Sequence, residues 1–139
     1  MQTAPVLLAI IVCDEIVRDE RTHKEYLLGL FNTIHAHVFP CVHPRLNVFV
    51  SLTNGHGTAP SELRLVHRDG GETLASTKGS VQFANPLALV NVNFEISNIG
   101  LPRPGRYSFD FLCHGELIGS RPFDVALQQA PPAAQPPPA

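Results

Sequence analysis

The chain has 139 residues, of which 44% are apolar and 16% are charged, and its formal net charge is -2. A chain of this length predicts a single domain with its own hydrophobic core. Its ten basic and twelve acidic residues are spread along the chain, which excludes a field that would hold nucleic acid or an anionic membrane by charge alone.

The first strands are expected to form a long hairpin. Residues 6–13 are a continuous apolar run, which is typical of a strand covered on both faces. The polar residues 14–25 predict a solvated connection, and the apolar pattern resumes over residues 26–38 as the returning strand. No window of useful length has the apolar spacing of an amphipathic helix, so we expect nearly all of the structure to be β.

Two prolines mark the end of this hairpin. Pro40 and Pro44 lack the backbone N–H that a strand ladder requires, which predicts that the chain leaves the sheet and turns there. Residues 45–52 then carry apolar side chains at every second position, as a strand with a buried face does. The positions assigned to the core are Leu46, Val48, Val50 and Leu52.

The middle of the chain predicts a second hairpin and a further strand. Residues 62–67 and 73–83 are expected to pair, because Asp69-Gly70 between them supplies the positive φ that tight turns need. Residues 87–96 alternate in the way of a half-buried antiparallel strand. Its inward positions are predicted to be Ala88, Val90, Val92, Phe94 and Ile96.

Tyr107 is the most diagnostic residue of the last part of the chain. It follows a corner rich in proline and glycine, as does the tyrosine of Greek-key sandwiches whose hydroxyl bonds to the backbone upstream. Together the elements predict an all-β fold: an antiparallel β-sandwich of about eight strands, Greek-key or immunoglobulin-like, over residues 1–127. Residues 128–139, rich in Ala, Pro and Gln, are expected to be a disordered tail.

The three cysteines indicate that the protein resides in a reducing compartment. Cys13, Cys41 and Cys113 match neither a disulfide framework nor a CxxC motif, so we interpret them as reduced thiols of a cytoplasmic protein. Cys13 and Cys113 lie in apolar strands, where burial is expected to raise the pKa of a thiol. No segment approaches the ~20 apolar residues of a membrane helix, and we expect no membrane partner.

A group of histidines provides the sharpest candidate for chemistry. His35 and His37 are two apart on a predicted strand, so their side chains project from one face, roughly 6 to 7 Å apart, and can chelate one metal ion. The turn at Pro40 would bring Cys41 or His43 back as a third ligand, giving the nitrogen and sulfur set that suits zinc. The alternative, favoured because no HExxH or paired CxxC is present, is that the histidines occupy the solvent face of the strand.

The connection predicted near residue 20 carries charges of both signs. Its carboxylates would suit Ca²⁺ on their own, but interleaved basic residues neutralise them and favour a solvated hairpin tip. The same charges would make a recognition surface for a protein partner. The residues assigned to that surface are Arg18, Asp19, Arg21 and Lys24.

Short motifs at both ends of the chain point to a family. Cys13-Asp-Glu15 precedes Arg18-Asp19 and Leu27-Leu-Gly-Leu-Phe31, and Pro104-Gly-Arg-Tyr-Ser-Phe109 precedes a hairpin at Gly115. The chain resembles, over roughly residues 5 to 126, a family of small uncharacterised bacterial β-sandwich proteins. The resemblance implies the fold and no activity.

The sequence carries no signature of an enzyme. We find no G-x-S-x-G elbow and no phosphate-binding loop. We therefore expect a non-enzymatic binding or assembly module that acts through contacts with a protein partner or a second copy, with no cofactor. Exposed strand edges would supply affinity through backbone hydrogen bonds. A zinc site at His35, His37 and His43, hydrolytic through a metal-bound water, is the alternative.

Overall fold

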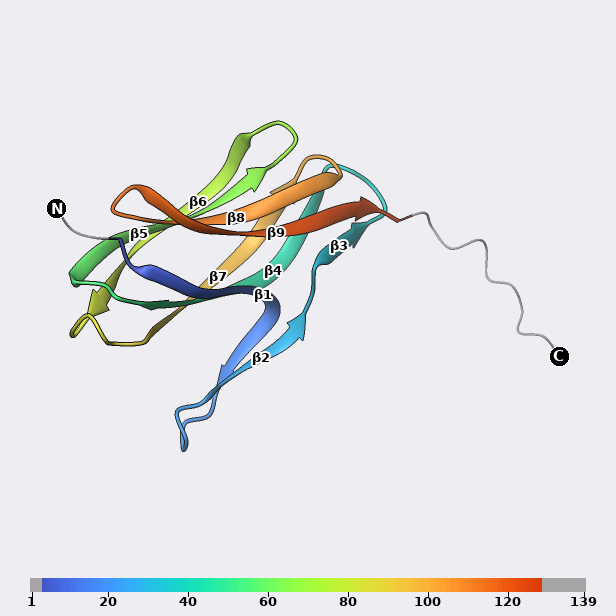
Figure 1. The fold of residues 1–139 in the computed structure, drawn as a ribbon. Helices are drawn as coiled ribbons and strands as arrows, with labels where there is room; N and C mark the ends of the chain where they lie inside the picture. The colour runs from blue at the N-terminus through green and yellow to red at the C-terminus, as the bar shows by residue number, and fades with distance from the viewer. Residues whose placement is uncertain (1–3, 129–139) are drawn as a thin grey trace.

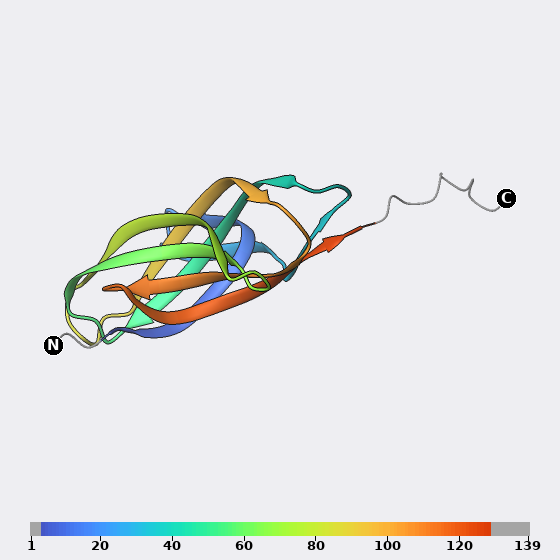
Figure 2. The ribbon, with the colours of Figure 1, turned by 90° about the horizontal axis from the view of Figure 1, so that it is seen from above.

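A computed structural model describes residues 4–128, and the regular structure of this part of the chain is entirely β. Two sheets stack face to face (Figures 1 and 2). The first has the strand order β2-β1-β4-β7 and the second the order β3-β9-β8-β5-β6. The strands are β1 (Val6–Arg18), β2 (Glu25–Leu30), β3 (Thr33–Ala36), β4 (Cys41–Thr53), β5 (Gly57–His67), β6 (Glu72–Phe83), β7 (Val90–Leu101), β8 (Gly105–Cys113) and β9 (Glu116–Leu127).

The predicted all-β sandwich is confirmed, with one departure from antiparallel pairing. The short strand β3 runs parallel to β9, while the other paired strands of residues 4–128 are antiparallel. A parallel pair needs a long connection, and here the five strands β4 to β8 lie between the two. The predicted tail at 128–139 lies outside the described residues except for Gln128.

The core lies between the two sheets, where the two-residue period of the strands places it. Leu46, Val48, Val50 and Leu52 of β4 are fully buried, which confirms the predicted inner face. The second sheet contributes the facing residues Leu63, Leu65, Phe109, Phe111 and Phe123. Removal of these side chains from water is the main force that holds the sheets together.

Tyr107 forms the predicted corner. Its buried hydroxyl donates a hydrogen bond to the Arg103 carbonyl and accepts one from the Arg103 N–H at 3.4 Å. The ring stacks on Phe123 with centroids 5.7 Å apart. Burial raises the pKa of the Tyr107 hydroxyl, which therefore stays a neutral donor.

The first strand is longer than the apolar run predicts. The prediction ended the strand at Cys13, but β1 continues through the polar residues to Arg18 and pairs with β2, with Arg18 opposite Glu25. This outer part of the hairpin has a neighbour in the sheet only on the β2 side, so its side chains meet water and need not be apolar. The connection itself is confined to residues 19–24.

The predicted single strand over residues 26–38 is wrong. The chain forms β2 in the first sheet and then β3 in the second, with only Phe31 and Asn32 between them (Figure 1). Asn32 fixes the crossing, because its carbonyl accepts the Asp124 N–H at 2.8 Å and its side chain accepts from Arg121 at 2.8 Å. An apolar pattern alone does not reveal such a change of sheet.

The predicted start of the next strand at residue 45 is also wrong, because β4 begins at Cys41 and contains Pro44. In this part β4 pairs only with β7, through His43 opposite Ile99 and Arg45 opposite Ser97, and its pairing with β1 begins at Asn47. The register skips Pro44 itself, so its missing N–H lies at a break in the ladder with β7.

A hydrogen-bonded carboxylate on β5 makes the stability depend on pH. Glu62 accepts hydrogen bonds from Arg64 Nε at 2.8 Å and from Ser76 Oγ of β6 at 2.6 Å. These bonds, the one from Arg64 foremost, lower the pKa of Glu62 from 4.5 to about 2. A depressed pKa in the folded state contributes stability that is fully present above the unfolded pKa and is lost as the pH falls through the folded one.

The variant Glu62→Gln is expected to be less stable than the wild type at neutral pH, and the difference is expected to shrink between pH 4.5 and about 2. Urea denaturation at both ends of this range measures the difference. Glu116→Gln, at the exposed first residue of β9, is the matched control and is expected to be neutral. A destabilisation by Glu62→Gln that is equal at both pH values would contradict the assignment.

Candidate functional site

The structure does not bring the predicted metal ligands together. His35 lies on β3 and is exposed, whereas His37 follows the end of β3 and has its Nδ1 3.0 Å from the Gln128 carbonyl oxygen. Cys41 and His43 lie on β4 in the other sheet, because the chain crosses between sheets at Pro40. Within residues 4–128, no three His, Cys, Asp or Glu side chains form a group that would hold a metal ion.

Cys41 and His43 border two different hollows. Cys41 borders an apolar hollow of about 450 Å³ between β6 and β7, where burial raises the pKa of its thiol. His43 borders a different hollow, of about 280 Å³, together with His35. The close spacing of these residues in the sequence therefore does not predict a shared site.

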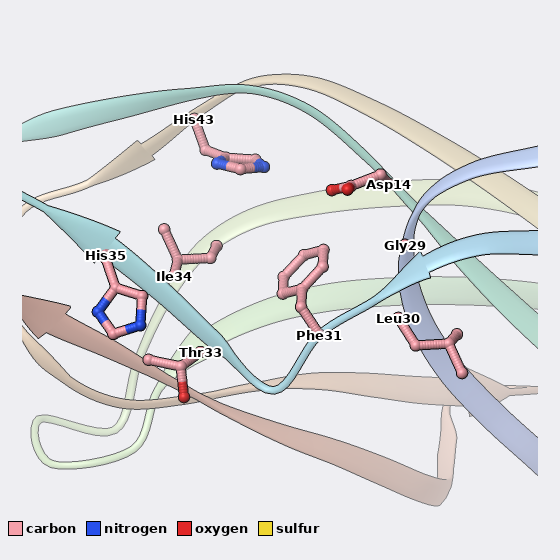
Figure 3. Close-up of a pocket in the computed structure, with 8 residues that line it drawn as sticks. All are labelled: Asp14, Gly29, Leu30, Phe31, Thr33, Ile34, His35 and His43. Carbon is pink, nitrogen blue, oxygen red and sulfur yellow. The ribbon is translucent and has the colours of Figure 1, made fainter.

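The hollow beside His43, here called the crossover pocket, lies where the chain passes from β2 to β3. Figure 3 shows its lining: Asp14 projects from β1 and His43 from β4, and Phe31 of the crossing segment and Ile34 of β3 point toward them. The His35 side chain points away from these four. The pocket thus joins residues from three separate parts of the chain.

Gly29 gives the pocket its shape. Its φ of +72° is a backbone conformation that glycine adopts readily and other residues rarely do. A Cβ at this position would lie 2.4 Å from Oδ2 of Asp14, so a side chain here would displace the carboxylate. Glycine therefore lets the Asp14 side chain lie against β2 at the mouth of the pocket.

The polar atoms of the crossover pocket are free to bind. Among the described residues no basic side chain forms an ion pair with the Asp14 carboxylate. His43 Nε2 is buried and has no hydrogen-bond partner among these residues, so a ligand reaches it only when the imidazole turns toward the pocket. The Phe31 ring lies beside the imidazole, with ring centroids 6.1 Å apart. The arrangement offers a negative charge, a hydrogen-bonding nitrogen and an aromatic ring.

The four charged residues predicted to bind a partner do lie together, at the tip of the β1–β2 hairpin. Asp19 has a structural role there, because its carboxylate accepts the Arg21 and Thr22 N–H groups at 2.8 and 3.1 Å and shapes the turn. Arg21 and Lys24 are exposed, and Arg18 lies 3.5 Å from Nδ1 of His23. Arg18, Arg21 and Lys24 are therefore the cations that the tip presents to solvent.

Sequence reasoning missed an apolar surface beside this tip. Four large side chains of the hairpin are between 40% and 63% exposed. Their register with β1 places them on one face, and the signal for it is the apolar run over residues 26–28 that continues at Leu30. We call this surface the hairpin face; its residues are Val17, Tyr26, Leu28 and Leu30.

The opposite side of the hairpin turns back toward the first sheet. Asn93 of β7 donates a hydrogen bond to Glu25, and Leu27 lines a hollow with Phe49 and Asn91. These contacts anchor the hairpin to the first sheet, and Tyr26 of the hairpin face also borders this hollow. The position of the hairpin beyond the body of the sandwich is visible in Figure 1.

Within residues 4–128 no helix has the length and apolar character needed to cross a membrane. No curated protein matches the sequence. Among solved structures 47 chains match, including the Pseudomonas fluorescens alkylpurine DNA glycosylase AlkC bound to DNA containing an abasic site analogue. That similarity has a TM-score of 0.46 at 17% identity and covers 68% of this chain but only 27% of that one. A family model covers residues 8–126, and the chain therefore belongs to the family of unknown function DUF6941, which confirms its resemblance to an uncharacterised family.

Proposed function

We propose that the protein is a non-enzymatic assembly module that associates with a second copy of itself through the hairpin face. The observation that carries this proposal is the cluster of four large apolar side chains exposed on one side of a hairpin that projects from the sandwich. Contiguous apolar surface of this kind is typical of a protein interaction site.

Three features favour a second copy as the occupant. A two-fold arrangement places the hairpin face against itself, apolar on apolar. The neighbouring tip is self-complementary in charge, since Arg21 and Lys24 lie beside Glu20, and the formal net charge of -2 produces little repulsion between copies. In addition, β2 is an edge strand of its sheet, so its outer backbone groups can extend the sheet into a neighbour.

The cysteines support a non-enzymatic role in a reducing compartment, the cytoplasm. Cys13, Cys41 and Cys113 are free thiols. Burial raises the pKa of Cys113 to about 11 and also raises that of Cys13, so neither thiol is activated as a nucleophile. The protein acts in this proposal by contact with protein, not with nucleic acid or membrane.

Sedimentation equilibrium tests the proposal. The wild type is expected to dimerise at micromolar concentrations, and the double variant Leu28→Glu with Leu30→Glu is expected to be monomeric because it places two charges on the apolar contact. The matched control is Leu87→Glu with Leu89→Glu, which alters two exposed leucines of the β6–β7 connection and is expected to leave the dimer intact. A monomeric wild type, or equal disruption by the control, would refute the proposal.

The charged tip is expected to contribute less than the hairpin face. Arg18→Glu with Arg21→Glu is expected to weaken association by roughly two- to tenfold, an effect that salt screens, because exposed ion pairs contribute about 0–1 kcal/mol each. The measurement is the dimer dissociation constant at low and high salt. A salt-independent loss of the dimer would assign the tip a packing role instead.

A further inference from the structure

We infer that the crossover pocket binds a cationic nitrogen group, a guanidinium or an ammonium on a short aliphatic chain. The inference does not rest on the proposed self-association, because Asp14, His43 and Phe31 are not part of the hairpin face; Leu30 is the one residue of that face that also borders the pocket. The pocket volume of about 280 Å³ is at the small end of ligand sites and suits a group the size of one side chain.

The charge of the pocket decides which ligands it favours. Asp14 supplies a carboxylate at the mouth, and the pocket lining includes no lysine or arginine. An anionic ligand would be repelled, and a neutral one would leave the carboxylate without a counter-charge. A cation forms charge-assisted hydrogen bonds to the carboxylate, which are stronger than bonds between neutral groups.

The two other groups favour a cation that carries N–H donors. His43 Nε2 is buried without a partner among the described residues; when the imidazole turns toward the pocket, the tautomer protonated on Nδ1 accepts a hydrogen bond there from the ligand. A hydrogen bond to a buried polar atom removes the penalty of leaving that atom unpaired. The Phe31 ring lies 6.1 Å from the imidazole and presents its π-system to the same space, where a cation is attracted by the ring quadrupole.

Guanidinium satisfies all three groups more fully than ammonium. Its planar fork has several N–H donors, so one edge can bind the Asp14 carboxylate while another N–H reaches His43 and the plane lies against Phe31. Two sources share this chemistry: the arginine side chain of a peptide, and a free alkylguanidine. The peptide source gains additional contacts from the backbone around the arginine, whereas the free source does not.

The test is an NMR titration of the full chain with N-acetyl-arginine methylamide and with methylguanidinium. N-acetyl-citrulline methylamide, which has nearly the same shape without the charge, is the matched control ligand. We expect saturable shifts at Asp14, Phe31 and His43 at millimolar concentrations of the cations, and at least tenfold weaker binding of citrulline. If the arginine ligand binds more tightly than methylguanidinium, the natural ligand is an arginine side chain of a peptide. If the two bind equally, it is a free alkylguanidine.

Protein variants locate the site. Asp14→Asn is expected to weaken binding of the arginine ligand by about tenfold or more, because it removes the charge that pairs with the guanidinium. Glu15→Gln, the adjacent exposed carboxylate on the other face of β1, is the control and is expected to bind as the wild type does. Equal binding of citrulline and arginine by the wild type, no saturable shift, or unchanged binding by Asp14→Asn would overturn the inference, whatever the oligomeric state.

Discussion

Replacing Phe111 with Ala is expected to lower the free energy of unfolding by about 3–5 kcal/mol, the largest loss from any single change considered for this chain. Phe111 lies on β8 and is fully buried. Its ring meets Phe94 of β7 edge to face, with centroids 6.1 Å apart, and so joins the two sheets. Truncation leaves a cavity between the layers that the surrounding strands cannot fill without moving.

Urea denaturation followed by circular dichroism measures this loss. The control is Leu89→Ala, because Leu89 is 74% exposed and its truncation is expected to change the stability by less than about 0.5 kcal/mol. A loss below about 1 kcal/mol for Phe111→Ala would show that the ring is not enclosed between the two sheets. The comparison separates core packing from the general effect of removing an apolar side chain.

The second large effect is expected at Gly55, in the connection between β4 and β5. Gly55 is buried, and a Cβ added there would lie 2.3 to 2.4 Å from three atoms of the Phe83 ring. Phe83 is itself part of the core, so its ring has little room to move aside. Gly55→Ala is therefore expected to destabilise the fold by about 1–3 kcal/mol through overpacking.

The matched control for this prediction is Gly100→Ala. Gly100 lies on β7, and a Cβ there meets no atom within 4 Å, so the same substitution is expected to be neutral or slightly stabilising. Thermal unfolding of the two variants provides the comparison. If Gly55→Ala has the same melting temperature as the wild type, the Phe83 ring does not lie against the Gly55 backbone.

The sequence predicts the parts of the fold that depend on local patterns. The alternation over residues 45–52 identifies an inner face because a strand has a period of two wherever it pairs. The turn between β5 and β6 and the Tyr107 corner are likewise encoded within a few residues, and both are present in the structure, although the positive φ lies at Gly71 and not at Asp69-Gly70 as predicted. Local chemistry was sufficient in each case.

The features that the sequence does not predict depend on distant partners. Nothing within residues 26–38 indicates that the chain changes sheets, because the parallel pairing of β3 with β9 is decided near the other end of the chain. The extension of β1 to Arg18 likewise depends on its pairing with β2. Long-range pairing of this kind leaves little trace in a local pattern of apolar residues.

The candidate site could be predicted only in fragments for the same reason. Sequence reasoning assigned Asp14 to a charged connection and His43 to a metal site with His35 and His37, as neighbours in the chain suggest. The structure separates His37 from His43 and instead places His43 in one pocket with Asp14 and Phe31. The sheet crossing creates this combination, so predicting the site required predicting the crossing first.

The direction of the strands at the two limits of the described chain has a mechanical consequence. The start of β1 and the end of β9 lie at opposite ends of the sandwich (Figure 2). Tension applied between them acts along the strands, so it loads the hydrogen bonds that join β1 to β4 and β9 to β8 together, in shear. Bonds loaded in shear must break together. The barrier to unfolding under tension is therefore expected to be high.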